Sequence, residues 1–242
     1  MFQIFVKEIR LFFSSLTGYI AILVFLIANG LFMWVFPGEM NVLDAGYSSL
    51  DTLFMLAPWV FLFLVPAVTM RTFSEEHKAG TLELLLTKPI TEMELVMGKF
   101  LASVFLVFCA ILPTLIFFFS VYSLGNPVGN IDMGGTWGSF LGLFFLASAY
   151  VAVGVLTSTL STNQIVSFIL SMLLSFILYI GFEFIGTIQA LKGVESSIVW
   201  LGMNYHYKSM SRGVIDSRDV IYFLSVAAIF LFASKLILQR RK

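Results

Sequence analysis

The residues that could carry out chemistry in this chain are few and scattered. One of its two histidines, His77, follows two carboxylates in the sequence Glu75-Glu76-His77, which resembles a fragment of a zinc site. Zinc in proteins needs three or four ligands that meet at one point. The second histidine, His206, is expected on the opposite side of a membrane from His77. The sequence therefore predicts no metal site.

Motifs for nucleotide hydrolysis and acyl transfer are also missing from the sequence. Gly98-Lys99 lacks the earlier glycine of G-x-x-x-x-G-K-[ST] and is followed by Phe100, so it is not a phosphate-binding loop. A serine hydrolase would need a G-x-S-x-G elbow, which the chain does not contain. Cys109 is the single cysteine, which excludes an internal disulfide. We expect no catalytic residue and no cofactor bound by this chain.

The composition indicates that the elements positioning these residues lie in a membrane. Of the 242 residues, 59% are hydrophobic and 12% are charged, and the mean hydropathy is +0.97. A soluble domain has roughly 25% charged residues and cannot bury so much apolar surface. The net charge of zero indicates no nucleic-acid partner. The sequence predicts an all-α polytopic membrane protein, with residues 1–242 as a single domain surrounded by membrane lipid.

Six apolar segments have lengths close to the ~20 residues that cross a hydrocarbon core. Before them, residues 1–18 place apolar and polar side chains on opposite faces of a helix, which is typical of an amphipathic helix in the interface plane. Pro113 is expected to interrupt the third span. The expected spans are residues 19–36, 52–70, 100–124, 137–160, 165–185 and 220–238.

Cations are distributed unequally between the two faces that these spans define. Ten lie on the face of the N-terminus and four on the other. Because loops rich in Lys and Arg remain in the cytoplasm, both termini are predicted to be cytoplasmic. The ten are Lys7, Arg10, Arg71, Lys78, Lys88, Lys99, Lys235, Arg240, Arg241 and Lys242, and the four are Lys192, Lys208, Arg212 and Arg218. The largest feature predicted on the cytoplasmic face is residues 71–99, named here the central stretch.

Two helix-start signals divide the central stretch. Thr72 and Glu75 have the T-x-x-E spacing of a capping box, which predicts a helix that runs towards Leu86. The same spacing at Thr91 and Glu94 predicts the helix that returns to the membrane. The stretch is therefore expected to present one short helix to water, followed by the start of the third span.

The central stretch resembles the cytoplasmic loop of ABC-2 type transporter permeases. The matching sequence is M-R-T-F-S-E-E-x-x-x-G-T-L-E-L-L-L-T-x-P-I-T, followed by G-K-F-L-A. The resemblance covers the whole chain, from the amphipathic helix through six spans of the type V exporter-like arrangement. Near the C-terminus, Y-H-Y at 205–207, R-G-V-I-D at 212–216 and D-V-I-Y-F at 219–223 resemble the gliding-motility permeases, the GldF-like subgroup.

The resemblance implies an exporter subunit in a bacterial inner membrane. Its central stretch would act as a coupling loop and contact a separate cytoplasmic ABC ATPase subunit. That partner would bind ATP and Mg²⁺, and a second permease half, either another copy or a different protein, would complete the pathway. Acids at this position could also simply favour a helix start, but apolar residues among the charges favour a partner surface. The residues expected at or near the contact are Arg71, Phe73, Glu75, Glu76, Gly80, Thr81, Leu82 and Glu83.

The longest loop on the opposite face, residues 189–219, is the predicted gating region. The resemblance implies short re-entrant helices there, whereas the residues alone also fit an ordinary loop with an interfacial helix anchored by aromatic side chains. An ionisable residue within a span, here Glu183, is either functional or reaches the headgroups. The candidates for the pathway or its gate are Glu183, Tyr179, Trp200, Tyr205 and Tyr207.

Three further charged residues have ordinary structural interpretations. Lys99 is expected to extend from the third span to the membrane interface. Asp216 and Asp219 are expected to begin the sixth span.

Two other classes of function remain beside the exporter. An ATP-independent secondary transporter or channel would place several ionisable groups within its spans, and only Glu183 qualifies. A non-transporting membrane scaffold of a motility or secretion machine would have the same hydropathy as a permease. An export permease linked to gliding motility is therefore the preferred prediction.

Overall fold

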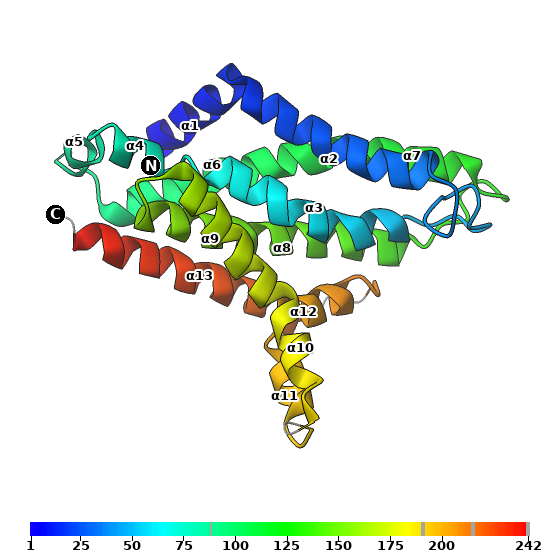
Figure 1. The fold of residues 1–242 in the computed structure, drawn as a ribbon. Helices are drawn as coiled ribbons and strands as arrows, with labels where there is room; N and C mark the ends of the chain where they lie inside the picture. Colours follow the sequence, from blue (N-terminus) through cyan, green and yellow to red (C-terminus); the bar gives the residue numbers. More distant parts are fainter. Residues whose placement is uncertain (88, 190–191, 214–215, 241–242) are drawn as a thin grey trace.

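A computed structural model describes the 242 residues with the exception of 88, 190–191, 214–215 and 241–242. Every regular element in the described part is a helix, which confirms the all-α prediction (Figure 1). The helices form an elongated bundle with both termini at one end, beside α4 and α5, and this end is called the loop end. Lys88, Arg241 and Lys242 of the cation count, and residues 214–215 of the gliding-motility resemblance, lie outside the described residues.

Membrane-length helices occur where the sequence predicts them. In the described part of the chain, five helical stretches are long and apolar enough to cross a membrane, or six if α1 and α2 are counted as one bent span. The first predicted span corresponds to α2, Leu16–Trp34. The other five are Asp51–Lys78, Glu92–Leu124, Met133–Leu160, Gln164–Gly186 and Ser217–Gln239.

The first helix is separate from the first span. α1, Phe2–Ser14, ends at Ser15, whose backbone is extended, and α2 leaves in a different direction (Figure 1). No residue of α1 is fully buried. It packs on α6, Glu92–Ile111, where the rings of Phe5 and Phe105 meet edge-on at 5.9 Å. This arrangement is consistent with an interfacial α1 followed by α2 as a span.

The central stretch forms two short helices where the sequence predicts one. They are α4, Ser74–Lys78, and α5, Leu82–Leu86. Gly80 between them has a φ of +68°, a left-handed conformation that ends a helix and favours glycine. The backbone therefore turns at Gly80, and the predicted helix towards Leu86 is divided there.

Of the two predicted capping boxes, one forms. At the start of α6, the Glu94 amide donates to the Thr91 hydroxyl at 3.2 Å, and the Thr91 amide donates to the Glu94 carboxylate at 3.0 Å. The prediction of a capping box at Thr72 and Glu75 is wrong. The Thr72 hydroxyl donates instead to the Thr69 carbonyl at 2.8 Å, because the chain is still leaving the preceding span at this point.

Two spans are interrupted. In the third, α6 gives way to a 3₁₀ turn, Leu112–Thr114, and then to α7, Leu115–Leu124, so the predicted break at Pro113 is confirmed. In the fifth, α9 passes through a π-helical turn, η2, into α10. Two more helices, α11 and α12, precede the last span, α13. Their bounds are Gln164–Phe176 for α9, Ile177–Gly181 for η2, Phe182–Gly186 for α10, Glu195–Trp200 for α11, Met203–Met210 for α12 and Ser217–Gln239 for α13.

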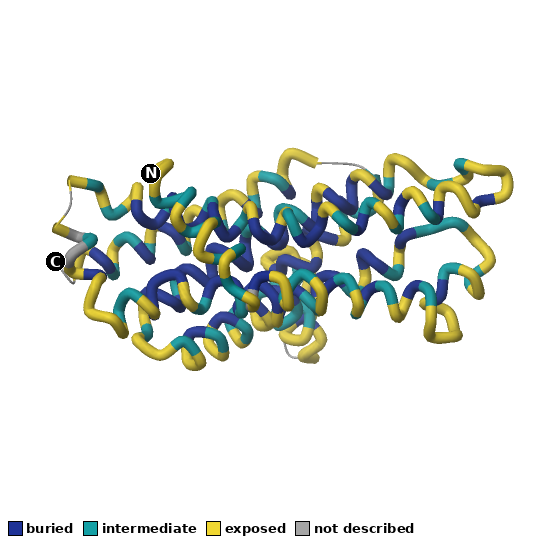
Figure 2. The backbone as a smooth tube through the Cα atoms, turned by 90° about the horizontal axis from the view of Figure 1, so that it is seen from above, coloured by how far each residue is buried: buried dark blue, intermediate teal, exposed yellow. Residues whose placement is uncertain are grey.

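The centre of the bundle is α8, Met133–Leu160. α3 (Asp51–Thr69), α6, α9, α12 and α13 all pack against it. Figure 2 shows the buried residues concentrated along the middle of the molecule, with exposed residues at its ends. Small residues let the helices approach closely, since a Cβ on Gly154 of α8 would lie 2.0 Å from the Thr69 hydroxyl of α3. By contrast, α10 and α11 project from the side of the bundle (Figure 1).

Candidate functional site

Buried serine hydroxyls fix the beginning of the central stretch to two other helices. Ser74, Ser158 and Ser167 lie on α4, α8 and α9, and all three are fully buried. The Ser74 hydroxyl lies 3.1 Å from the Ser158 hydroxyl and 2.8 Å from the Ser167 hydroxyl. The Ser158 hydroxyl also accepts from the Phe73 amide at 2.9 Å. The start of α4 is therefore tied to the end of α8 and the start of α9.

A cluster of charges ties the same stretch to α1. The Lys99 ammonium lies 2.8 Å from the Glu8 carboxylate of α1 and 3.0 Å from the Glu76 carboxylate of α4. It also donates to the Thr72 carbonyl and lies 4.9 Å from the centre of the Phe73 ring. With only 1% of its side chain exposed, Lys99 does not reach the interface, so that prediction is wrong.

Lys7 of α1 extends this cluster to the surface. Its ammonium lies 3.0 Å from the Glu76 carboxylate and 3.9 Å from the Glu8 carboxylate, so two cations balance two acids. Burial disfavours the ammonium, but the hydrogen bond to Glu76 and the attraction of nearby acids outweigh burial and raise the pKa of Lys7. A raised lysine pKa contributes stability that is lost only as the pH rises through that pKa, so the pair persists at neutral pH.

Beyond these two clusters, much of the part of the central stretch before α6 is exposed. Five of the eight residues predicted to contact an ATPase subunit lie on this exposed part. Both ends of the α4–α5 turn carry an acid, and the turn between them contains the left-handed glycine. The loop therefore presents a small charged surface, called here the tip, in which the acids Glu75 and Glu83 are accompanied by Arg71. The five exposed residues are Arg71, Glu75, Gly80, Thr81 and Glu83.

The other three predicted contact residues face the protein interior. Phe73 is fully buried and Leu82 is 3% exposed, so neither offers an apolar anchor to a partner. Glu76 is the carboxylate that Lys7 and Lys99 share, and 12% of its side chain is exposed. The error has a physical cause, because an apolar residue between charges gives the same sequence pattern whether it packs on a partner or on its own chain.

The aromatic residues predicted for gating separate into buried and exposed ones. Trp200 and Tyr205 are 48% and 45% exposed, and their position at a membrane interface stays a prediction. Tyr179 is buried. Tyr207 is not an interface anchor, because its hydroxyl donates to the Phe54 carbonyl of α3 at 2.7 Å. Burial raises the pKa of Tyr207 well above its ordinary value, so this phenol remains a donor.

Glu183 connects α10 to α12. Its carboxylate accepts from the Asn204 amide at 2.9 Å and from the Lys208 ammonium at 3.2 Å. The side chain is 30% exposed, so the pair with Lys208 contributes little stability by itself. These contacts give Glu183 a role in holding α10 and α12 together, and its predicted role in a pathway stays untested.

The most enclosed titratable group of the α10–α12 segment is one that sequence analysis misses. His206 is fully buried. Its Nδ1 lies 2.7 Å from the Asp219 carboxylate of α13, and its Nε2 lies 2.8 Å from the Trp200 carbonyl. The Tyr222 ring stacks on the imidazole with 3.8 Å between centroids. The pair therefore fixes α12 and the end of α11 to the last span.

The two acids predicted to begin the last span have different roles. Asp216 caps α13, since its carboxylate accepts from the Arg218 amide at 2.9 Å. Asp219 is 4% exposed and turns inward to His206. The available signal was a histidine between two tyrosines with an acid 13 residues later, but spacing alone does not show that the intervening loop folds back.

Sequence analysis also misses a polar stripe along the fifth span. Ser167, Ser171, Ser175, Tyr179 and Glu183 follow one another at steps of four residues. The three serines are fully buried and therefore face the bundle. This i, i+4 repeat was visible in the sequence, but the hydropathy of the segment as a whole conceals it.

Comparison with known proteins identifies the class to which this arrangement belongs. Residues 4–211 match the family described as ABC-2 family transporter protein, which is most of the chain. The chain therefore belongs to the ABC-2 transporter family, as the central stretch predicts.

Two curated relatives are described as membrane proteins of the same class. The chain is 28% identical over 179 residues to the protein described as probable multidrug ABC transporter permease YbhS of Escherichia coli strain K12, and equally to its counterpart in Escherichia coli O157:H7. The alignment covers 69% of this chain but 43% of each relative. The chain thus spans less than half the length of the curated relatives it matches. The gliding-motility subgroup stays a prediction.

Proposed function

We propose that this chain is the permease subunit of an ABC exporter in a bacterial inner membrane, and that a separate cytoplasmic ATPase subunit docks on the tip. The ATPase would bind ATP and Mg²⁺. The observation that supports this most is a contrast within the central stretch. Glu75, Thr81 and Glu83 are exposed, whereas the base beneath them is held by buried polar groups from three other helices.

This contrast is what a coupling element needs. A partner that moves the tip would act on α8 and α9 through Ser74, because its hydroxyl is bonded to serines on both helices. It would act on α1 and α6 through Glu76, which is paired with Lys7 and Lys99. Buried hydrogen bonds and ion pairs of this kind resist separation, since breaking one leaves an unpaired polar group.

Charge reversal at the tip tests the docking proposal. Changing Glu75 and Glu83 to lysine should leave the amount of permease in the membrane unchanged, because both side chains are exposed. Recovery of the ATPase subunit in mild detergent should fall, because attraction to the partner becomes repulsion. Glu39→Lys is the matched control, because Glu39 is an exposed acid in the loop between α2 and α3. That loop lies at the end of the bundle opposite α4 and α5 (Figure 1). Equal ATPase recovery from all three proteins would contradict docking at the tip.

A complete pathway requires a second permease half, which we propose packs against the exposed spans. In the fifth span, Gln164–Gly186, and in α13, only 22% of the most apolar part is buried within this chain. A second copy and a different permease are both compatible with this surface. Mass determination of the purified complex distinguishes them, and a permease that is monomeric with its ATPase bound would contradict a two-half pathway.

Two more specific functions, gliding motility and multidrug efflux, each have one line of support. The sequence around 205–223 resembles gliding-motility permeases, and the curated relatives are described as multidrug permeases. Deleting the gene and scoring both gliding and drug susceptibility separates these possibilities. Loss of gliding alone supports the motility function, and drug sensitivity alone supports efflux. We favour motility because the resemblance extends over three separate segments near the C-terminus.

A further inference from the structure

Three buried hydroxyls between α8 and α9 have no hydrogen-bond partner among the described residues. They belong to Tyr150 on α8 and to Ser171 and Ser175 on α9, all of which are 0% exposed. Other serines in the spans behave differently. Ser148 and Ser234 each donate at 2.8 Å to the carbonyl four residues earlier. The two α9 serines therefore forgo a bond that their own helix offers.

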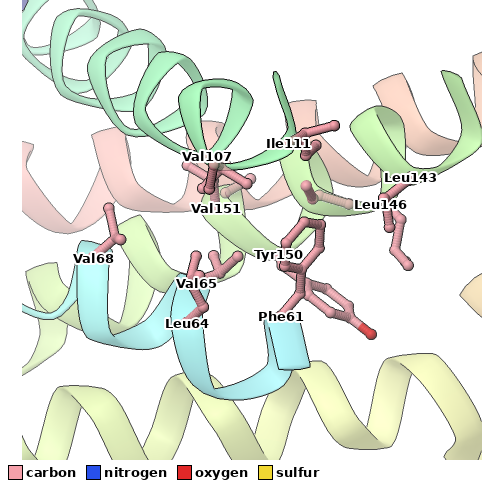
Figure 3. Packing of buried hydrophobic residues seen from close by; sticks show 14 of the residues in the cluster. Phe61, Leu64, Val65, Val68, Val107, Ile111, Leu143, Leu146, Tyr150 and Val151 are labelled. Carbon is pink, nitrogen blue, oxygen red and sulfur yellow. The ribbon is translucent and has the colours of Figure 1, made fainter. Parts of the chain in front are cut away.

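The three residues belong to two neighbouring helices. α8 and α9 pack against each other, and the Tyr150 ring meets the Tyr179 ring edge-on with 6.2 Å between centroids. Tyr179 follows Ser175 by about one turn on the stripe. Figure 3 shows the Tyr150 side chain beside Phe61 of α3. The unpaired groups thus come from both sides of one helix contact.

A buried hydroxyl without a partner destabilises a folded protein, and internal water commonly fills this need. Water can donate and accept at once, and a buried water typically has about three polar partners. We propose that Tyr150, Ser171 and Ser175 form a binding site for internal water between α8 and α9. No part of this proposal requires an ATPase subunit or a transported substrate.

The water site would complete a polar connection along the fifth span. At one end of the stripe, Ser167 is bonded to Ser74 of the central stretch. At the other, Glu183 is bonded to Asn204 and Lys208 of α12. Water between these points can re-form its hydrogen bonds when a helix shifts. Provided that the chain is an exporter, α9 is then the span best suited to move against α8 during transport.

Thermal unfolding of the purified protein tests whether the hydroxyls have partners. We expect Tyr150→Phe, and the double variant Ser171→Ala with Ser175→Ala, to lower the Tm by about 2–4 °C for each bonded hydroxyl removed. Ser234→Ala is the matched control, because Ser234 is a fully buried span serine whose bond goes to the carbonyl four residues earlier in its own helix. A bond of this kind adds little stability to a helix, so the Tm should change little. An unchanged or higher Tm in the test variants would overturn the proposal, because removing an unpaired hydroxyl relieves a cost.

Radiolytic footprinting then identifies the partner as water. X-rays generate hydroxyl radicals from bound water, so a buried ring beside such water is oxidised. Tyr150 should be oxidised more than Tyr207, which is equally enclosed but bonded to a protein carbonyl. Oxidation of Tyr150 should fall in the double serine variant. Equal protection of both tyrosines would overturn the water site even if the Tm falls. Neither experiment depends on transport. Both results can therefore be interpreted even if the export proposal is wrong.

Discussion

The central stretch and the α10–α12 segment both contain short helices at the ends of spans, but they are attached in opposite ways. In the central stretch, the buried pair Lys99–Glu8 joins residues 91 positions apart. In the α10–α12 segment, the buried pair His206–Asp219 joins residues 13 positions apart. The central stretch is a junction of helices that are far apart in the sequence. The α10–α12 segment is a local unit, held largely by contacts between residues that are close in the sequence.

One long-range bond qualifies this contrast. The Tyr207 hydroxyl of α12 reaches the Phe54 carbonyl of α3, which is 153 positions away. Figure 1 shows the consequence for the overall shape, because α12 lies on the bundle while α10 and α11 project from it. Damage to the central stretch should therefore spread through the bundle. Damage to the α10–α12 segment should remain local.

The largest effect is expected from Lys99→Met. This change leaves the Glu8 and Glu76 carboxylates without their buried cation and should cost about 3 kcal/mol, the lower end of the range because both acids keep some exposure. Thermal unfolding and the amount of protein in the membrane measure it. Lys78→Met, at a neighbouring exposed lysine, is the control. If adding Glu8→Gln and Glu76→Gln to Lys99→Met restores no stability, unpaired charge is not the cause.

A smaller and local effect is expected from His206→Ala. Asp219 then loses its buried partner, and the free energy that holds α11 and α12 in place should fall by about 2 kcal/mol. Hydrogen exchange in these two helices should accelerate by about 30-fold, while α3 exchanges as before. Tyr205→Ala, an exposed neighbour on α12, should change neither. Faster exchange throughout the bundle would show that the segment is not a local unit.

A third change acts on the bond that links α12 to α3. Tyr207→Phe removes the donor to the Phe54 carbonyl and should cost about 1 kcal/mol. Exchange should rise in α12 and also near Phe54 in α3, which distinguishes it from His206→Ala. Tyr205→Phe serves as the control because its side chain is half exposed. No difference between the two phenylalanine variants would mean that the bond contributes no stability.

The spans could be predicted because they depend on local properties of the sequence. Apolar length determines where a helix can cross lipid, Pro113 cannot donate within a helix, and Thr91 with Glu94 lies within one turn. Each of these features needs no knowledge of the rest of the fold. The resemblance of the central stretch to ABC-2 permeases could likewise be recognised, because it rests on a continuous run of residues.

The direction of individual side chains could not be predicted. Glu75 and Glu76 are adjacent acids on a helix of five residues, and only the position of Lys99 and Lys7 decides which one faces inward. The partner of Ser74 lies on α9, 93 positions later. Such pairs form because the helices pack, so the information lies in the tertiary arrangement rather than in local spacing.

The smallest effect on stability is expected at Glu75, and its neighbour provides the contrast. Glu75→Gln should change the free energy of unfolding by less than about 0.5 kcal/mol, because the side chain is exposed. Glu76→Gln removes the charge that Lys7 and Lys99 share, and should lower the Tm clearly.

ATPase recovery should show the reverse order: once the loss of stability is taken into account, Glu75→Gln should have the larger effect and Glu76→Gln the smaller. With permease amounts matched, Glu75→Gln should reduce ATPase recovery, because it removes charge from the tip, whereas Glu76→Gln acts on docking only through the fold. Lowering the temperature should therefore restore ATPase recovery for Glu76→Gln and leave the loss at Glu75→Gln unchanged. If both variants lower the Tm equally, the inward and outward roles assigned to these two acids are wrong. If Glu75→Gln leaves both Tm and ATPase recovery unchanged, the contact must rest on other residues of the tip, with Thr81 and Glu83 the next to change.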